Sequence, residues 1–142
     1  MKKISLLSLL LTLLLLSCSG TGNNAEKNLK TLSAEDFKIE LEKMSGDPQT
    51  VLLDIRTLPE YKSGALQNAE LLDFYSDTFA QQLNALDKNK TYFIYCRSGN
   101  RSGQTMKMME KAGFKRVYEL GGGINSWLAK GYNTITVNKV TR

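Results

Sequence analysis

The pattern of hydrophobic and polar positions divides the chain into three parts. An apolar run extends from Ile4 to Leu16, and the small, polar stretch SGTGNNAEKN follows Cys18. From about Leu29, short apolar runs of strand length alternate with stretches in which apolar residues recur at helical spacing. We therefore predict one folded domain over residues 29–142, preceded by a segment of different character.

Within the folded part, strands are predicted to alternate with helices. TVLLDI and TYFIYC are continuous apolar runs, typical of strands buried on both faces. Ser33 with Asp36 three residues later is typical of a helix start, and Phe37, Leu41 and Met44 then share one face. The predicted strands are Thr50–Ile55, Ala69–Leu72, Thr91–Cys96 and Arg116–Leu120, and the predicted helices are Ser33–Met44, a short one from Pro59, Thr78–Leu86, Ser102–Ala112 and Ile124–Lys130. This alternation predicts an α/β domain with a mainly parallel sheet and a single core.

The N-terminal part has the character of an export signal. Lys2 and Lys3 precede the apolar run, which is shorter than the roughly 20 residues that a membrane-spanning helix needs. LLSC, ending at Cys18, resembles the lipobox of bacterial lipoproteins, in which the cysteine becomes lipid-modified. The alternative is a short uncleaved anchor. We expect a signal peptide over residues 1–17, a lipidated Cys18 that begins a flexible tether over residues 18–28, and a lipoprotein facing the periplasm. In some bacteria an aspartate directly after the lipidated cysteine retains the lipoprotein in the inner membrane. Ser19 occupies that position here, which favours the outer membrane.

Composition narrows the chemistry of the domain. The chain of 142 residues contains no histidine and two cysteines, and its net charge of +5 falls to +3 once Lys2 and Lys3 are removed (17 basic minus 14 acidic). So small a net charge, without a long basic run, argues against a nucleic acid as partner. No HExxH, CxxC or acidic cluster indicates a metal, and no cofactor is expected. If Cys18 carries lipid, Cys96 is a lone thiol, either structural and buried or reactive.

The surroundings of Cys96 favour a reactive thiol. IYCRSGNRSGQ (residues 94–104) places it after a strand and before a helix, where open α/β sheets hold their ligands. Loop N–H groups, the helix dipole and two arginines would each stabilise a thiolate, so we expect a depressed pKa that needs no histidine base. The same cradle would hold an anion. The residues predicted to form it are Arg97, Ser98, Gly99, Asn100, Arg101 and Ser102.

Three segments together resemble the rhodanese family of sulfurtransferases. CRSGNRS resembles the family's active-site loop, LLDIRTLPEY its Asp–x–Arg strand end and following glutamate, and GGGINSWLAKGY its C-terminal Gly–Trp segment. The resemblance implies a parallel sheet of about five strands with helices on both faces. It also implies ping-pong sulfur transfer from a donor such as thiosulfate, through a persulfide on Cys96, to cyanide or a thiol. Ala65 stands where the family commonly has histidine, a change expected to affect packing rather than chemistry.

The resemblance extends to three supporting residues and leaves other functions open. Asp54, Arg56 and Glu60 match family positions that are either ion pairs supporting the loop or direct substrate contacts. Phosphatases that share this fold need an arginine after five intervening residues, whereas Arg101 follows Cys96 after four. A non-catalytic binding module would typically have lost the cysteine, and a thiol redox protein would normally want a second one. We expect a monomer that acts on small sulfur-containing anions or thiols.

Overall fold

The computed structural model describes residues 27–137. Its strands are β1 (Asn28–Leu32), β2 (Thr50–Asp54), β3 (Glu70–Leu71), β4 (Thr91–Tyr95) and β5 (Arg116–Leu120), and its helices are α1 (Ala34–Lys43), α2 (Leu58–Ser63), α3 (Phe79–Ala85), α4 (Asn100–Ala112) and α5 (Gly123–Ala129). The strands form one five-stranded sheet in the order β1-β5-β4-β2-β3, and every pairing is parallel. The predicted α/β fold, with a parallel sheet of about five strands, is confirmed.

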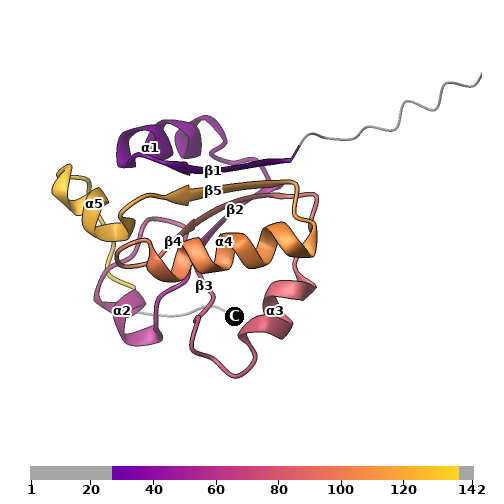
Figure 1. Ribbon diagram of the computed structural model, residues 1–142. Coiled ribbons are helices and arrows are strands. Elements are labelled where there is room, and N and C mark those ends of the chain that lie inside the picture. The colour runs from indigo at the N-terminus through magenta and orange to yellow at the C-terminus, as the bar shows by residue number, and fades with distance from the viewer. Residues whose placement is uncertain (1–26, 138–142) are drawn as a thin grey trace, which may run out of the picture.

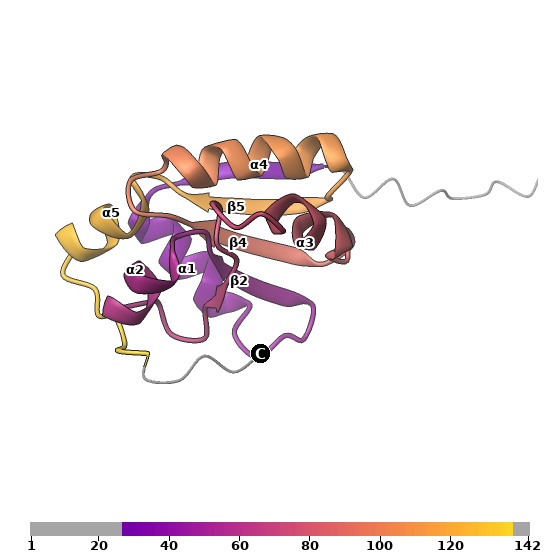
Figure 2. The same ribbon diagram turned by 90° about the horizontal axis from the view of Figure 1, so that it is seen from below.

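Helices cover both faces of the sheet, as Figures 1 and 2 show. One core cluster joins the sheet to α1, α2 and α5, with Phe93 in edge-to-face contact with Phe37. The other joins the opposite face to α3 and α4 and includes Met109 and Phe114. The central strand β4 is buried at every position, which explains its unbroken apolar sequence TYFIY.

The structure differs most from the predicted elements at β1 and at the start of α4. The strand β1 was not predicted, because Leu29 and Leu32 are its only apolar residues and do not alternate. Parallel pairing with β5 holds β1 at the edge of the sheet. The helix α4 begins at Asn100 rather than Ser102, so its first turn is part of the loop that contains the predicted site.

The predicted signal peptide over residues 1–17, Cys18 and the tether up to residue 26 lie outside the described residues. Between residues 27 and 137, the structure contains no helix long and apolar enough to cross a membrane.

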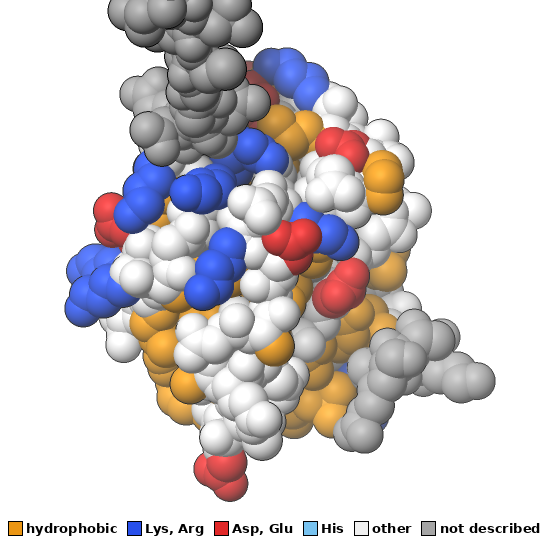
Figure 3. Space-filling model, turned by 90° about the vertical axis from the view of Figure 1, so that its right-hand side faces the viewer, with side chains coloured by type: hydrophobic (Ala, Val, Ile, Leu, Met, Phe, Trp, Pro, Cys, Tyr) orange, Lys and Arg blue, Asp and Glu red, His pale blue; other side chains and the backbone are white. Residues whose placement is uncertain are grey.

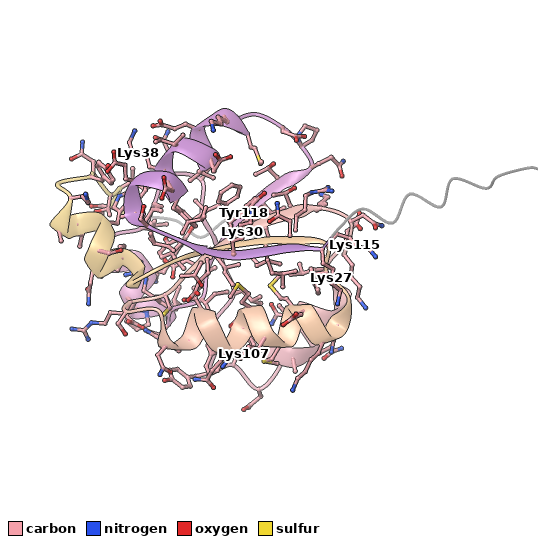
Figure 4. The ribbon with its side chains drawn as sticks, turned by 45° about the horizontal axis from the view of Figure 1, so that its top comes forward. Lys27, Lys30, Lys38, Lys107, Lys115 and Tyr118 are labelled. Carbon is pink, nitrogen blue, oxygen red and sulfur yellow. The ribbon has the colours of Figure 1, made fainter. Side chains whose placement is uncertain are left out.

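Parallel strands place two different surfaces at the two ends of the sheet. The described chain enters at Lys27, and Lys115 lies beside it where β5 begins (Figure 4). Figure 3 looks onto this end and shows Lys and Arg side chains interspersed with acidic ones. The carboxyl ends of β2, β4 and β5 meet at the opposite end, and Cys96 directly follows β4 there. The segments predicted to carry chemistry are therefore brought together at one edge.

Candidate active site

Cys96 lies at the base of the loop between β4 and α4. The residue is only 1% exposed, and its sulfur accepts a hydrogen bond from the backbone N–H of Gly99, with N and Sγ 3.1 Å apart. The hydroxyl of Ser102 lies 3.3 Å from the same sulfur. The loop therefore folds back over Cys96 and points donors at it.

The tight return of the loop depends on Gly99. This residue has φ +93°, in the left-handed region that side chains rarely adopt, and it directly precedes the first residue of α4. Its carbonyl accepts the first helical hydrogen bond from the N–H of Gly103. Asn100, the next residue, already has ordinary helical geometry.

The donors around the sulfur decide its ionisation. Burial by itself would raise the pKa of the Cys96 thiol, because a thiolate is poorly solvated inside a protein. Hydrogen bonds from the Ser102 hydroxyl and from the backbone N–H groups of Ser102, Ser98 and Gly99 outweigh that effect, and the pKa is lowered. The expected depression of the pKa thus has its cause mainly in hydrogen bonds.

Arg97 and Arg101 have a smaller part in lowering the pKa of Cys96 than the sequence suggested. Arg101 is held by Glu60 through two parallel hydrogen bonds of 2.8 Å, one from each terminal nitrogen. Glu60 in turn caps α2 by accepting from the N–H and the hydroxyl of Thr57. The Arg101 charge is therefore largely neutralised. Arg97 is exposed and forms no ion pair within residues 27–137, which leaves its cation available to an incoming anion.

The ion pair between Glu60 and Arg101 predicts a specific response to acid. The hydrogen bonds from Arg101, reinforced by those from Thr57, lower the pKa of Glu60 from 4.5 to about 2. A depressed carboxyl pKa contributes stability above the unfolded value, and this stability disappears as pH falls from about 4.5 towards 2. Glu60→Gln should therefore lower the urea midpoint most above pH 5 and progressively less at lower pH. A difference between wild type and variant that stayed constant over that range would contradict this account.

Asp54 and Arg56 form a second, buried ion pair at the carboxyl end of β2. Asp54 is fully buried and accepts from both the Nε and Nη2 atoms of Arg56, whose side chain is 6% exposed. Arg56 also donates to the carbonyl of Gly64, which follows α2. This geometry supports the reading of Asp54, Arg56 and Glu60 as structural supports, since every one of these charges is already paired.

The start of α5 fastens the loop from the other side. The N–H groups of Ile124 and Asn125 donate to the carbonyls of Cys96 and Arg97 at 2.8 and 3.1 Å. Gly123 lies so close that a Cβ atom there would stand 2.5 Å from the Cys96 carbonyl oxygen. Nothing in the sequence indicates this close contact beyond the resemblance of the GGGINSWLAKGY segment to the family.

One buried acid was missed by the sequence analysis. Glu119 in β5 is 4% exposed, and the hydroxyls of Ser102 and Thr31 lie 2.8 and 2.7 Å from its carboxylate oxygens. The signal was present, because Glu119 is the one charged residue between Val117 and Leu120 in an otherwise apolar strand.

Among residues 27–137, no group of three or more His, Cys, Asp or Glu side chains could hold a metal ion.

Comparison with known proteins identifies the family. The chain matches the model of the rhodanese-like domain over residues 38–130. A rhodanese-related protein from Thermoplasma volcanium superimposes with a TM-score of 0.64 at 24% identity, covering 76% of this chain and 99% of that one. A rhodanese-like domain protein from Staphylococcus aureus gives 0.58 at 30% identity, covering 69% and 90%. This chain belongs to the rhodanese-like domain family.

Similar curated sequences are much longer than this chain. A protein of Pectobacterium atrosepticum named tRNA uridine(34) hydroxylase is 41% identical over 87 residues, which cover 57% of this chain and 24% of that protein. A Yersinia pestis protein of the same name is 35% identical over 97 residues, covering 64% and 27%. The chain thus spans about a quarter of the length of the curated relatives it matches.

Proposed function

We propose that the protein is a sulfurtransferase that carries a sulfane sulfur on Cys96. The observation that carries the proposal is the set of donors directed at Sγ: the N–H of Gly99 at 3.1 Å and the hydroxyl of Ser102 at 3.3 Å. Such donors stabilise a thiolate, and a thiolate is the nucleophile that attacks sulfur. Membership of the rhodanese-like domain family supports the same reading.

The proposed reaction has two displacement steps. The Cys96 thiolate attacks the outer sulfur of thiosulfate, whose S–S bond breaks so that sulfite leaves with the bonding pair. Cyanide or a thiolate acceptor then attacks the outer sulfur of the Cys96 persulfide, and the cysteine leaves as a thiolate. Arg97, a loop cation that forms no ion pair within residues 27–137, would attract the anionic donor, and loop N–H groups would stabilise charge on the transferred sulfur.

A phosphatase is the alternative that shares the nucleophile and the fold, and the arginine argues against it. Phosphoryl transfer of this kind requires a guanidinium that binds two phosphoryl oxygens. Arg101 already uses both terminal nitrogens on Glu60. The loop from Cys96 to Arg101 is also one residue shorter than a phosphatase loop, which favours a single sulfur atom over a tetrahedral group.

The experiment that separates the two reactions compares two assays on the same preparation. We expect thiosulfate:cyanide sulfur transfer and negligible hydrolysis of an aryl phosphate. Inserting one glycine after Gly99 should diminish sulfur transfer, because it widens the loop around Sγ. Robust phosphatase activity in the wild type, without sulfur transfer, would overturn the proposal.

The named activity of the long relatives does not enter the proposal. Those proteins are named hydroxylases, and this chain matches about a quarter of their length. Because this chain matches only that part of them, we propose no hydroxylation for it.

We also propose that the protein is exported and held at a membrane by lipid on Cys18. The signal-like segment and LLSC support this proposal. In a Gram-negative host, the wild type should incorporate radiolabelled fatty acid and sediment with membranes, whereas Cys18→Ser should accumulate as unmodified precursor. Wild-type protein that carried no label and stayed in the soluble fraction would contradict the proposal.

A further inference from the structure

The Ser102 hydroxyl lies between two groups that can both carry negative charge. Its oxygen is 3.3 Å from Sγ of Cys96 and 2.8 Å from Oε1 of Glu119. Cys96 lies in the loop after β4, Ser102 in α4 and Glu119 in β5, and these residues are 1%, 0% and 4% exposed, respectively. No solvent-exposed group separates them, so the contacts form one buried chain from sulfur to carboxylate.

A hydroxyl has one proton to donate and can accept in return, so it cannot satisfy two anions at once. If Glu119 is ionised, the Ser102 proton points to Oε1, and the serine oxygen is left to accept the Cys96 S–H. If Cys96 is a thiolate, the Ser102 proton points to Sγ, and Oε1 needs a proton of its own to donate to the serine. The state with both anions ionised leaves one of them without the serine donor, in a site where burial makes charge repulsion strong.

We propose that Cys96 and Glu119 share one proton through the Ser102 hydroxyl, so that Glu119 is the internal proton acceptor for the nucleophile. When the thiolate forms, the proton on Sγ passes to the serine oxygen while the serine proton passes to Oε1 of Glu119. The net charge of the site does not change, and the proton remains inside the protein. Glu119 acts through Ser102 and is therefore a positioning residue rather than a catalytic one.

The surroundings of Glu119 fit this role. On the β1 side, the Thr31 hydroxyl donates to Oε2 at 2.7 Å. On the α4 side, besides Ser102, the nearest approach is by Gly103, where a Cβ atom would come within 3.4 Å of Oε1. Within residues 27–137, no lysine or arginine pairs with Glu119 within 4.0 Å. The carboxylate thus has hydroxyl donors but no cation that would hold it permanently ionised.

The proposal rests on Cys96 being the nucleophile, and it gives a physical reason why this chain needs no histidine beside it. The carboxylate of Glu119, 2.8 Å from the Ser102 hydroxyl, stands where it can take the proton that a histidine would otherwise accept. Coupling the two groups also predicts a distinctive titration, because the shared proton and the second proton leave in separate macroscopic steps.

The test is the pH dependence of the rate at which iodoacetamide alkylates Cys96 in the purified full-length protein. For the wild type we expect the alkylation rate to rise with pH in two steps, separated by a region in which it levels off. In that region one proton is shared between Cys96 and Glu119, so the fraction of thiolate does not depend on pH. Glu119→Gln should titrate in one step, its rate falling about tenfold per pH unit below the midpoint. Ser102→Ala should also abolish the level region, because the bridge is lost.

Glu110→Gln is the matched control, since Glu110 is an exposed glutamate of α4, and it should retain the two-step profile. A wild-type profile with a single step would overturn the proposal, whether or not Glu119→Gln moved its midpoint. No sulfur donor enters this assay. A two-step profile in a protein without sulfur-transfer activity would support the proton sharing and count against only the proposed function.

A second measurement covers the case in which Glu119→Gln fails to fold. In wild-type protein labelled with ¹³C at glutamate carboxyl groups, the Glu119 signal should titrate in two steps. Alkylating Cys96 removes the thiol proton and should reduce this to one step. A Glu119 signal that titrated identically before and after alkylation would overturn the proposal.

Discussion

Replacing Cys96 with serine is expected to abolish sulfur transfer and to leave the fold intact. A serine hydroxyl is not ionised at neutral pH and cannot carry a sulfane sulfur, so the thiosulfate:cyanide rate should fall to that of buffer alone. The substitution is nearly isosteric at a site that already holds hydrogen-bond donors, namely Gly99 and Ser102. The measurement is the cyanide assay, with thermal unfolding as the check on the fold.

The matched control for Cys96→Ser is Ser45→Ala. Ser45 is an exposed residue between α1 and β2, near the amino end of the sheet and away from the Cys96 loop. This variant should retain most of the activity. Sulfur transfer by Cys96→Ser above the buffer rate would show that the persulfide forms elsewhere or not at all.

Replacing Asp54 with alanine is expected to cause the largest loss of stability of any single change at the site. The substitution leaves the guanidinium of Arg56 buried without its counter-charge, and breaking a buried ion pair in this way costs about 3–5 kcal/mol. Urea unfolding should show a correspondingly lower free energy of unfolding. The exposed pair of Glu35 with Lys130 is the control, and Glu35→Ala should leave the midpoint nearly unchanged.

A double substitution distinguishes the buried charge from mere loss of packing. Asp54→Leu combined with Arg56→Met removes both charges, and apolar replacement of a buried pair is often neutral. The double variant should therefore be more stable than Asp54→Ala. If Asp54→Ala lost less than about 1 kcal/mol, the charge of Arg56 would have found another partner or water, and this account of the pair would be wrong.

The sequence was sufficient for the parts of the fold that depend on local pattern. β2 and β4 were predicted because strands buried on both faces are continuously apolar, and α1 because Ser33 caps it. β1 could not be predicted in the same way. Its sequence NLKTL has no clear period, and its conformation depends on hydrogen bonds to β5, which lies almost 90 residues away in the chain.

The same distinction holds for the active site. Cys96 and its loop are contiguous in sequence, so a short motif was enough to find them. The contacts of Glu119 with Ser102, and of Gly123 with the Cys96 carbonyl, join segments that only the folded sheet brings together. The pairing of Arg101 with Glu60 across 41 residues is another such contact. It changes the meaning of a motif residue, because a cation counted as free proves to be neutralised.

The intact mass of the protein after incubation with thiosulfate tests the central claim most directly. If Cys96 is the sulfur carrier, the wild type should gain the mass of one sulfur atom and release an equal amount of sulfite. It should then lose that added mass when cyanide is added. Cys96→Ser should gain nothing. Wild-type protein whose mass was unchanged after thiosulfate, while its thiol remained reactive towards iodoacetamide, would contradict the sulfurtransferase proposal.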